Sequence, residues 1–183
     1  YLFTNDSSLK NVTFGDSVTS LGNYPFKGCI SLTSVTLPEK ITKIGTSYFE
    51  GCTSLKSVTF GGSITEIQAS AFKNCSSLTE VALPETLKTI ANNAFDGCSS
   101  LTSIELPSKL TSIGYSAFAR TGLTEVTIPK GVTTLGTVGT TGYDIGGYYW
   151  YDTSTGNGAF AECDNLTKVV FEEGFKGEIG VNT

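Results

Sequence analysis

Apolar residues recur along this chain at a fixed interval of 23 positions, separated by stretches rich in Ser, Thr and Gly. Phenylalanine, leucine and cysteine all follow this interval. The positions are Phe26, Phe49, Phe72, Phe95 and Phe118, then Leu9, Leu32, Leu55, Leu78 and Leu101, then Cys29, Cys52, Cys75 and Cys98. A constant period of this length is typical of a solenoid, in which each repeat buries its apolar side chains against neighbouring repeats. We therefore expect one elongated interior in place of a globular core.

Within each repeat, the pattern predicts a strand, a second short strand and a short helical turn. Apolar residues alternate with hydroxyl residues over 32–38, and a proline ends this strand because it has no amide donor for a sheet. Ile41 and Ile44 mark the second short strand. The segment around Phe49 is expected to be a short helical turn that Gly51 ends as its cap. Stacking places equivalent strands about 4.8 Å apart in a parallel sheet.

If the repeats stack in register, equivalent residues form columns along the solenoid. The interior is expected to hold one aromatic and one aliphatic column, and the outward columns are polar. The aromatic column is Phe26, Phe49, Phe72, Phe95, Phe118 and Phe160, and the aliphatic column is Val12, Val35, Val58, Val81, Ile104, Val126 and Val169.

The repeat pattern resembles the BspA-like, or Treponema pallidum-type, leucine-rich repeat family. It reads Leu-x-x-Val-x-Leu-Pro, then Ile-x-x-Ile-Gly, then Ala-Phe-x-Gly-Cys, and residues 71–78 and 94–101 fit it closely. The expected fold class is an α/β repeat solenoid, a leucine-rich-repeat right-handed superhelix with a parallel β-sheet, second short strands and short helical turns. The resemblance implies a bacterial or protist cell-surface protein that acts in adhesion and ligand binding, without catalytic residues.

The whole chain, 1–183, is expected to form a single solenoid of about seven units, the first and last of them partial. Phe3 is already in phase with Phe26, so the first residues look like the tail of an earlier repeat. Two departures interrupt the array. The repeat after Phe118 is one residue shorter and has no cysteine, and an insertion at about 137–156 delays the next phenylalanine, Phe160.

This insertion is rich in aromatic residues and glycine, and it provides the candidate binding residues. They are Tyr143, Asp144, Tyr148, Tyr149, Trp150, Tyr151 and Asp152. Aromatic side chains with polar tips are favoured at binding surfaces, where their faces stack and their polar groups form hydrogen bonds. The alternative is that the loop folds back and its aromatic residues cover an exposed flank of the solenoid. The sequence leaves both interpretations open.

Charge and residue content exclude several functions. The net charge is −5 and no cluster of Lys or Arg occurs, which argues against nucleic acid and anionic membranes as partners. No apolar stretch has the length of a membrane span, so we expect no direct membrane insertion. Without histidine, Ser/His and Cys/His nucleophile activation is excluded, and we expect no enzyme and no cofactor.

The five cysteines occupy one repeat position and lack the close pairs that metal or redox sites need, so no metal site is expected. Cysteine is among the most buried residue types. Buried free thiols that form a spine are therefore the first interpretation, and an occasional disulfide between neighbouring repeats is the alternative.

These observations indicate a non-enzymatic binding or adhesion module of a cell-surface or secreted protein. The expected partner is a protein, either from the host matrix or co-expressed at the surface, which is recognised through the strand face and the inserted loop. Two alternatives remain: a glycan-binding module that uses Trp150 and its neighbouring tyrosines, and a structural spacer in a longer polypeptide. The expected localisation is extracellular or at the cell surface.

Overall fold

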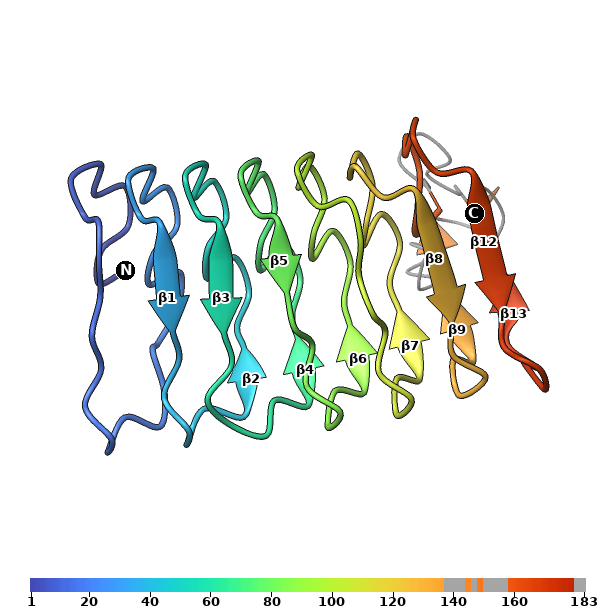
Figure 1. The fold of residues 1–183 in the computed structure, drawn as a ribbon, viewed down its shortest axis with the longest axis horizontal. Helices are drawn as coiled ribbons and strands as arrows, with labels where there is room; N and C mark the ends of the chain where they lie inside the picture. The colour runs from blue at the N-terminus through green and yellow to red at the C-terminus, as the bar shows by residue number, and fades with distance from the viewer. Residues whose placement is uncertain (137–143, 146–147, 150–157, 180–183) are drawn as a thin grey trace.

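The computed structural model describes residues 1–136, 144–145, 148–149 and 158–179. The chain winds into coils, each about one repeat long, that lie side by side along a single axis (Figure 1). Each regular coil passes through a first strand position, a second strand position and a turn that contains the repeated phenylalanine. The elongated interior predicted from the 23-residue period is therefore confirmed.

The first strand positions form two parallel sheets. Their order is β1-β3-β5 and β12-β8, and residues 101–107 between them have no regular strand. The bounds are β1 (Ser34–Thr36), β3 (Ser57–Thr59), β5 (Glu80–Val81), β8 (Glu125–Ile128) and β12 (Lys168–Phe171). Val35 lies opposite Val58, which lies opposite Val81, and Val126 lies opposite Val169. The register confirms the predicted aliphatic column at these five positions.

The second strand positions form one six-stranded parallel sheet in the order β13-β9-β7-β6-β4-β2. The bounds are β2 (Lys43–Ile44), β4 (Glu66–Ile67), β6 (Thr89–Ile90), β7 (Ser112–Ile113), β9 (Thr134–Leu135) and β13 (Glu178–Ile179). In the first five of these strands the second residue is a buried Ile or Leu. The predicted second short strands are therefore present.

The turn of each coil that contains the phenylalanine, here called the Phe turn, is not helical. The described residues contain no helix, so the helical turns and the α component of the predicted α/β class are wrong. The reason lies in the hydrogen bonds: Phe49 N donates to Ala71 O at 2.8 Å, and Gly51 N donates to Lys73 O at 2.8 Å. These amides bond the next coil, so they are not available to carbonyls four residues back as an α-helix requires. Gly51, expected to cap that helical turn, has a left-handed φ of +75°, but no helix precedes it.

The interior is built around the aromatic column. From Phe26 to Phe160, successive rings stack with centroids 5.2–5.4 Å apart and planes within 4–8° of parallel. Phe160 follows the insertion in the sequence but lies directly on Phe118, and Phe118 N donates to Ala159 O at 2.8 Å. Burial of one such side chain contributes about 1.5–3 kcal/mol. The repeat therefore resumes in register after the insertion, as the sequence predicted.

Candidate binding surface

The outer face of the first strands is a continuous row of exposed side chains. In β1, Ser34 and Thr36 are exposed on either side of buried Val35, and β8 alternates in the same way. Because successive side chains of a strand point to opposite faces, the apolar half of β1, β3, β5 and β8 is in the core and the polar half faces outward, whereas all four residues of β12 are exposed. We call this row of β1, β3, β5, β8 and β12, together with the exposed residues of 101–107 that connect the two sheets, the strand face.

The strand face changes in chemistry along the solenoid. Its first half presents hydroxyl groups, as at Ser34 and Thr59, and its second half presents carboxylates at Glu80, Glu105 and Glu125. Glu125 Oε2 lies 3.3 Å from Lys168 Nζ, and both side chains are mostly exposed. Such a surface offers hydrogen-bond acceptors and donors in rows one coil apart.

The candidate residues of the insertion are only partly described. β10 (Asp144–Ile145) and β11 (Tyr148–Tyr149) pair as an antiparallel hairpin, with Asp144 opposite Tyr149. Tyr143, Trp150, Tyr151 and Asp152 lie outside the described residues.

Backbone hydrogen bonds to the neighbouring coil fix the points where the insertion leaves and rejoins the solenoid. Gly136 N donates to Ile113 O at 2.9 Å, and Ser116 N donates to Gly158 O at 3.2 Å. The insertion therefore starts after β9 and ends at the next Phe turn, on the side of the coils between the six-stranded sheet and the Phe turns.

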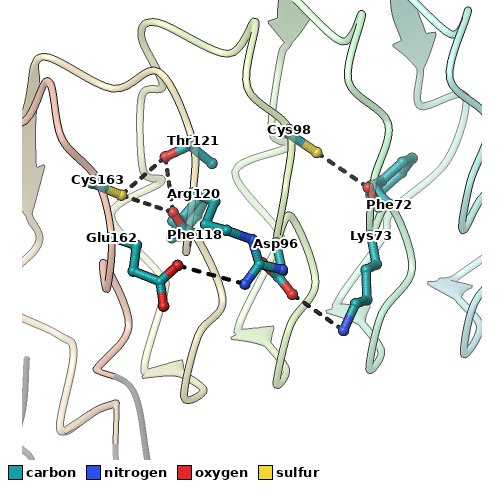
Figure 2. A network of polar contacts seen from close by, with 9 residues as sticks. All are labelled: Phe72, Lys73, Asp96, Cys98, Phe118, Arg120, Thr121, Glu162 and Cys163. Carbon is teal, nitrogen blue, oxygen red and sulfur yellow. Dashed lines mark hydrogen bonds and ion pairs between the residues drawn. The ribbon is translucent and has the colours of Figure 1, made fainter.

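Beside the point where the insertion rejoins the solenoid, a network of charged groups spans four successive coils (Figure 2). Arg120 Nη2 lies 2.7 Å from Asp96 Oδ1, and Lys73 Nζ lies 3.2 Å from Asp96 Oδ2. On the other side, Arg120 Nη1 lies 3.9 Å from Glu162 Oε2. The network therefore connects coils that precede the insertion to the coil that follows it.

Asp96 is the buried centre of this network, with 3% of its side chain exposed. Its Oδ1 is in ionic contact with Arg120, although no N–H group points at it in hydrogen-bond geometry. A buried carboxylate is tolerated only when opposite charges compensate it, and Lys73 and Arg120 do so here from the two neighbouring coils.

Sequence reasoning missed this network, although a signal was present. Lys27, Glu50, Lys73 and Asp96 directly follow the repeated phenylalanine and alternate in sign, and Lys27 Nζ lies 2.9 Å from Glu50 Oε2. Burial alone would raise the pKa of Glu50, but hydrogen bonds from Ser47 and Lys27, with the charges of Lys27 and Lys73, lower it. Charge alternation at a fixed repeat position is thus a sequence signal for ion pairs between coils.

Arg120 and Glu162 also occupy an unusual backbone conformation. Their φ angles are +53° and +54°, in the left-handed region, where Gly51 and Gly97 stand at the equivalent position of other coils. A side chain in this conformation costs about 1–2 kcal/mol relative to right-handed backbone. Arg120 offsets this cost through its ion pairs with Asp96 and Glu162.

The cysteines form the buried spine that their spacing predicted. All five are free thiols; four are buried and Cys163 is half-buried. Cys52 Sγ donates to Phe26 O at 3.0 Å, and Cys75 and Cys98 make the same bond to the phenylalanine carbonyl one coil earlier. Burial raises the pKa of Cys52 to about 12 and raises those of Cys75 and Cys98 as well. These thiols are protonated hydrogen-bond donors and weak nucleophiles.

In the shorter repeat, Thr121 replaces the cysteine. Its Oγ1 donates to Phe118 O at 2.8 Å, and Cys163 Sγ of the next coil donates to the same carbonyl at 3.0 Å (Figure 2). The missing cysteine is therefore replaced by another small side chain that binds a phenylalanine carbonyl.

Two surface hollows of the described residues are small. One of about 350 Å³ is lined by Tyr24, Tyr48 and Gln68 among others, and one of about 300 Å³ lies beside Arg120 and Glu162. Both volumes are at the lower end of the range of about 300–1,000 Å³ in which proteins enclose small ligands. Within the described residues, no group of three His, Cys, Asp or Glu side chains is placed to hold a metal ion.

Stacked coils with Leu at the strand entry and a parallel strand in each coil define a solenoid of leucine-rich repeats. Residues 20–138 match the BspA type leucine rich repeat region in six copies. The chain belongs to the family of BspA-type leucine-rich repeat proteins. The resemblance of its motifs to this family is thereby confirmed.

The solved structures similar to this chain include three of bacterial leucine-rich repeat proteins. A leucine-rich repeat protein from Bacteroides ovatus shares 31% identity at a TM-score of 0.61, over 75% of this chain and 33% of its own. A leucine rich cell surface protein from Faecalibacterium prausnitzii shares 30% identity at a TM-score of 0.54, over 77% of this chain and 39% of its own. The leucine-rich repeat protein of T. pallidum shares 31% identity at a TM-score of 0.63, over 81% of this chain and 61% of its own.

The chain spans only 33% and 39% of the first two of these proteins. Among curated proteins, none matches it. Proteins of this family are generally not enzymes, and their leucine-rich repeats typically mediate protein interactions. In the part of the chain that the structure describes, no helix is long and apolar enough to span a bilayer.

Proposed function

We propose that this chain is a non-enzymatic binding module of a cell-surface or secreted protein, and that the strand face recognises a protein partner. The observation that supports this proposal is the continuous row of exposed residues on five strands, from Ser34 in β1 to Lys168 in β12. In β1, β3, β5 and β8 these side chains point away from the buried apolar residues. A solenoid presents such a row as an extended surface suited to another protein.

The chemistry of the strand face indicates what kind of partner fits. Hydroxyl groups in the first half bind polar backbone or side chains, and Glu80, Glu105 and Glu125 in the second half favour a basic patch. The expected partner is a host matrix protein or a co-expressed surface protein with a positively charged contact region. Its association rate should fall as salt is raised, because the charges steer the encounter.

The test is surface plasmon resonance with the immobilised chain and candidate matrix or surface proteins. Thr36→Arg together with Thr59→Arg places bulky positive side chains on the strand face, and binding should fall by tenfold or more, roughly the effect of one central contact. Lys88→Glu, on the side of the six-stranded sheet, is the matched control and should bind as the unaltered chain does. Equal binding by all three proteins would contradict the proposal.

The insertion supports a second candidate function, glycan binding. The β10–β11 register brings Asp144 opposite Tyr149 in the hairpin, so an acidic and an aromatic residue are neighbours on the backbone. Carboxylates accept hydrogen bonds from sugar hydroxyls and aromatic rings stack on sugar faces. We propose Tyr143, Asp144, Tyr148, Tyr149, Trp150, Tyr151 and Asp152 as the residues of this site.

A glycan array with the unaltered chain and Trp150→Ala tests this candidate. Binding that is lost in Trp150→Ala supports it, and binding that is absent or unchanged contradicts it. Deletion of residues 137–156 separates a binding role of the insertion from a purely structural one. If the deletion leaves protein and glycan binding unaffected, the insertion serves only as packing or spacing.

A further inference from the structure

A hollow on the flank of the solenoid gathers residues that depart from the repeat pattern. It has a volume of about 350 Å³ and lies beside β2 and β4 (Figure 1), at the border between the six-stranded sheet and the Phe turns. Three adjacent coils line it, and the segment with Gly45 and Tyr48 lies between the other two. The hollow therefore opens on the flank of the solenoid and not at an end.

Tyr48 is the first of these departures. Four other coils have a fully buried alanine directly before the repeated phenylalanine, namely Ala71, Ala94, Ala117 and Ala159. The ring of Tyr48 is 5% exposed and contacts Phe49 edge to face, with centroids 6.3 Å apart. It also lies over Gly45, where any Cβ atom would collide with the ring. Because alanine is sufficient in the other coils, the fold itself does not require a tyrosine here.

Tyr24 and Lys43 are exceptions at their own repeat positions. The five coils that follow Tyr24 have a small residue there, and among the described coils Lys43 is the one basic residue at its position. The equivalents are Ser47, Ser70, Asn93, Ser116 and Gly158 for Tyr24, and Ser20, Glu66, Thr89, Ser112 and Thr134 for Lys43. Tyr24 has a left-handed φ of +51°, which is unusual for a bulky residue. Exceptions at separate repeat positions thus meet at one hollow.

The remaining side chains of the lining are polar and uncharged. Gln68 Oε1 accepts a hydrogen bond from Thr46 N at 3.2 Å, which leaves the two amide N–H groups of Gln68 as donors for a ligand. Asn23 adds a second amide. Glu66 lies opposite Lys43 in the register, but in the described part of the chain no carboxylate lies within ion-pair distance of Lys43. The Lys43 ammonium group is therefore available to a negatively charged ligand.

We propose that this hollow binds a sugar unit that carries a carboxylate, such as a hexuronic acid. Amide and hydroxyl groups suit the hydroxyl groups of a sugar, tyrosine rings suit its apolar C–H surface, and the Lys43 ammonium group suits the carboxylate. A volume near the lower limit of small-ligand sites fits one sugar unit better than a long chain. The site is separate from the strand face and from the insertion, so it goes beyond both proposed functions.

Three small probes separate these contributions. Methyl β-glucuronide and methyl β-glucoside differ only in the carboxylate, and cyclohexanecarboxylate keeps a ring and a carboxylate without hydroxyl groups. In ¹H–¹⁵N correlation spectra of the whole chain, methyl β-glucuronide should shift the amide signals of Thr46 and Gln68 with a Kd on the order of 1 mM. The other two probes should bind at least about twofold more weakly, because each lacks an ion pair or hydrogen bonds.

Variants of the lining residues assign the contacts. Lys43→Gln should reduce the affinity for methyl β-glucuronide to that for methyl β-glucoside. Lys88→Gln, beside β6 and outside the hollow, is the matched control and should leave both affinities unchanged. Tyr24→Ser and Tyr48→Ala introduce the residues of other coils, so they should fold, and each should weaken both sugars by about two- to tenfold.

Deletion of residues 137–156 should leave this binding unchanged, which distinguishes the hollow from a glycan site in the insertion. A disaccharide that ends in glucuronic acid distinguishes a glycan end from a free sugar acid, and binding of either source supports the proposal. Three results would overturn it. They are the absence of saturable shifts at the hollow, equal affinity of Lys43→Gln and the unaltered chain for methyl β-glucuronide, and equal binding of cyclohexanecarboxylate. Loss of binding in the deletion would assign the sugar to the insertion instead.

Discussion

At the scale of single residues, small buried side chains donate hydrogen bonds to backbone carbonyl groups of the preceding coil. The Sγ atoms of Cys52, Cys75 and Cys98 each bond the carbonyl of a phenylalanine in the preceding coil at 3.0–3.1 Å. Cysteine suits this position because it is small, apolar and still a weak donor. Each thiol therefore fills space in the core and satisfies a buried acceptor at once.

Cys75→Ala is expected to lower the free energy of unfolding by about 1–2 kcal/mol, because it removes this bond and leaves a small gap in the core. Urea denaturation measures the change. Ser103→Ala removes one oxygen at an exposed position and should change stability by less than about 0.5 kcal/mol. Equal losses in the two variants would show that the thiol does not contribute.

The same thiols predict a loss of stability at alkaline pH. Burial raises the pKa of Cys52 from 9.0 to about 12, so between these values the unfolded chain ionises while the folded chain keeps its proton. Unfolding then releases protons, and stability that is complete below pH 9 decreases as pH rises.

Urea midpoints measured below and above pH 9 test this expectation, and Cys52→Ser is the control. Serine does not ionise in this range, so this variant should lose less stability with pH than the unaltered chain. An identical pH dependence in both proteins would rule out Cys52 as a source of the stability loss at alkaline pH.

At the scale of elements, ion pairs between coils secure the Phe turns beside the insertion. Asp96 is buried between Lys73 and Arg120, and Arg120 reaches Glu162 in the coil that follows the insertion (Figure 2). Arg120 and Glu162 carry these charges on left-handed backbone, where glycine would be less strained. The network holds the Phe turns in register where the chain connectivity between them is longest.

A double-mutant cycle of Asp96→Ala and Arg120→Gly should give a coupling energy of about 1–3 kcal/mol, because Asp96 is desolvated. The exposed pair of Glu125 and Lys168 is the matched control, and its coupling should be below about 0.5 kcal/mol. Thermal or urea unfolding of the four proteins in each cycle provides the measurement. Equal coupling in both cycles would contradict a special role for the buried network.

At the scale of the whole molecule, stability depends on contact between neighbouring coils. Each central phenylalanine stacks on two others, whereas Phe3 stacks on Phe26 alone along the column, with centroids 5.8 Å apart. A defect in the middle of the column therefore affects two interfaces between coils, and a defect at the end affects one.

Phe72→Ala should accordingly lower the free energy of unfolding by about 3–5 kcal/mol, the usual range for truncation of a buried phenylalanine. Phe3→Ala is the control and should cost clearly less, because Phe3 is only partly buried. Chemical denaturation followed by circular dichroism compares the two. Similar losses at both positions would contradict the dependence on neighbouring coils.

The sequence by itself determined the solenoid, the two strand positions of each coil and the columns of Phe, Val and Cys. It could do so because a fixed period forces equivalent residues into equivalent contacts, as the stack from Phe26 to Phe160 illustrates. Only the tertiary structure decided that the Phe turns are not helices, since Phe49 N bonds the next coil. The alternating charges indicated that Lys73 lies beside Asp96, but the tertiary structure alone brought Arg120, which stands one position outside that column, to the same carboxylate. Backbone hydrogen bonds and ion pairs between different repeat positions depend on which groups meet in space, and a local pattern does not contain that information.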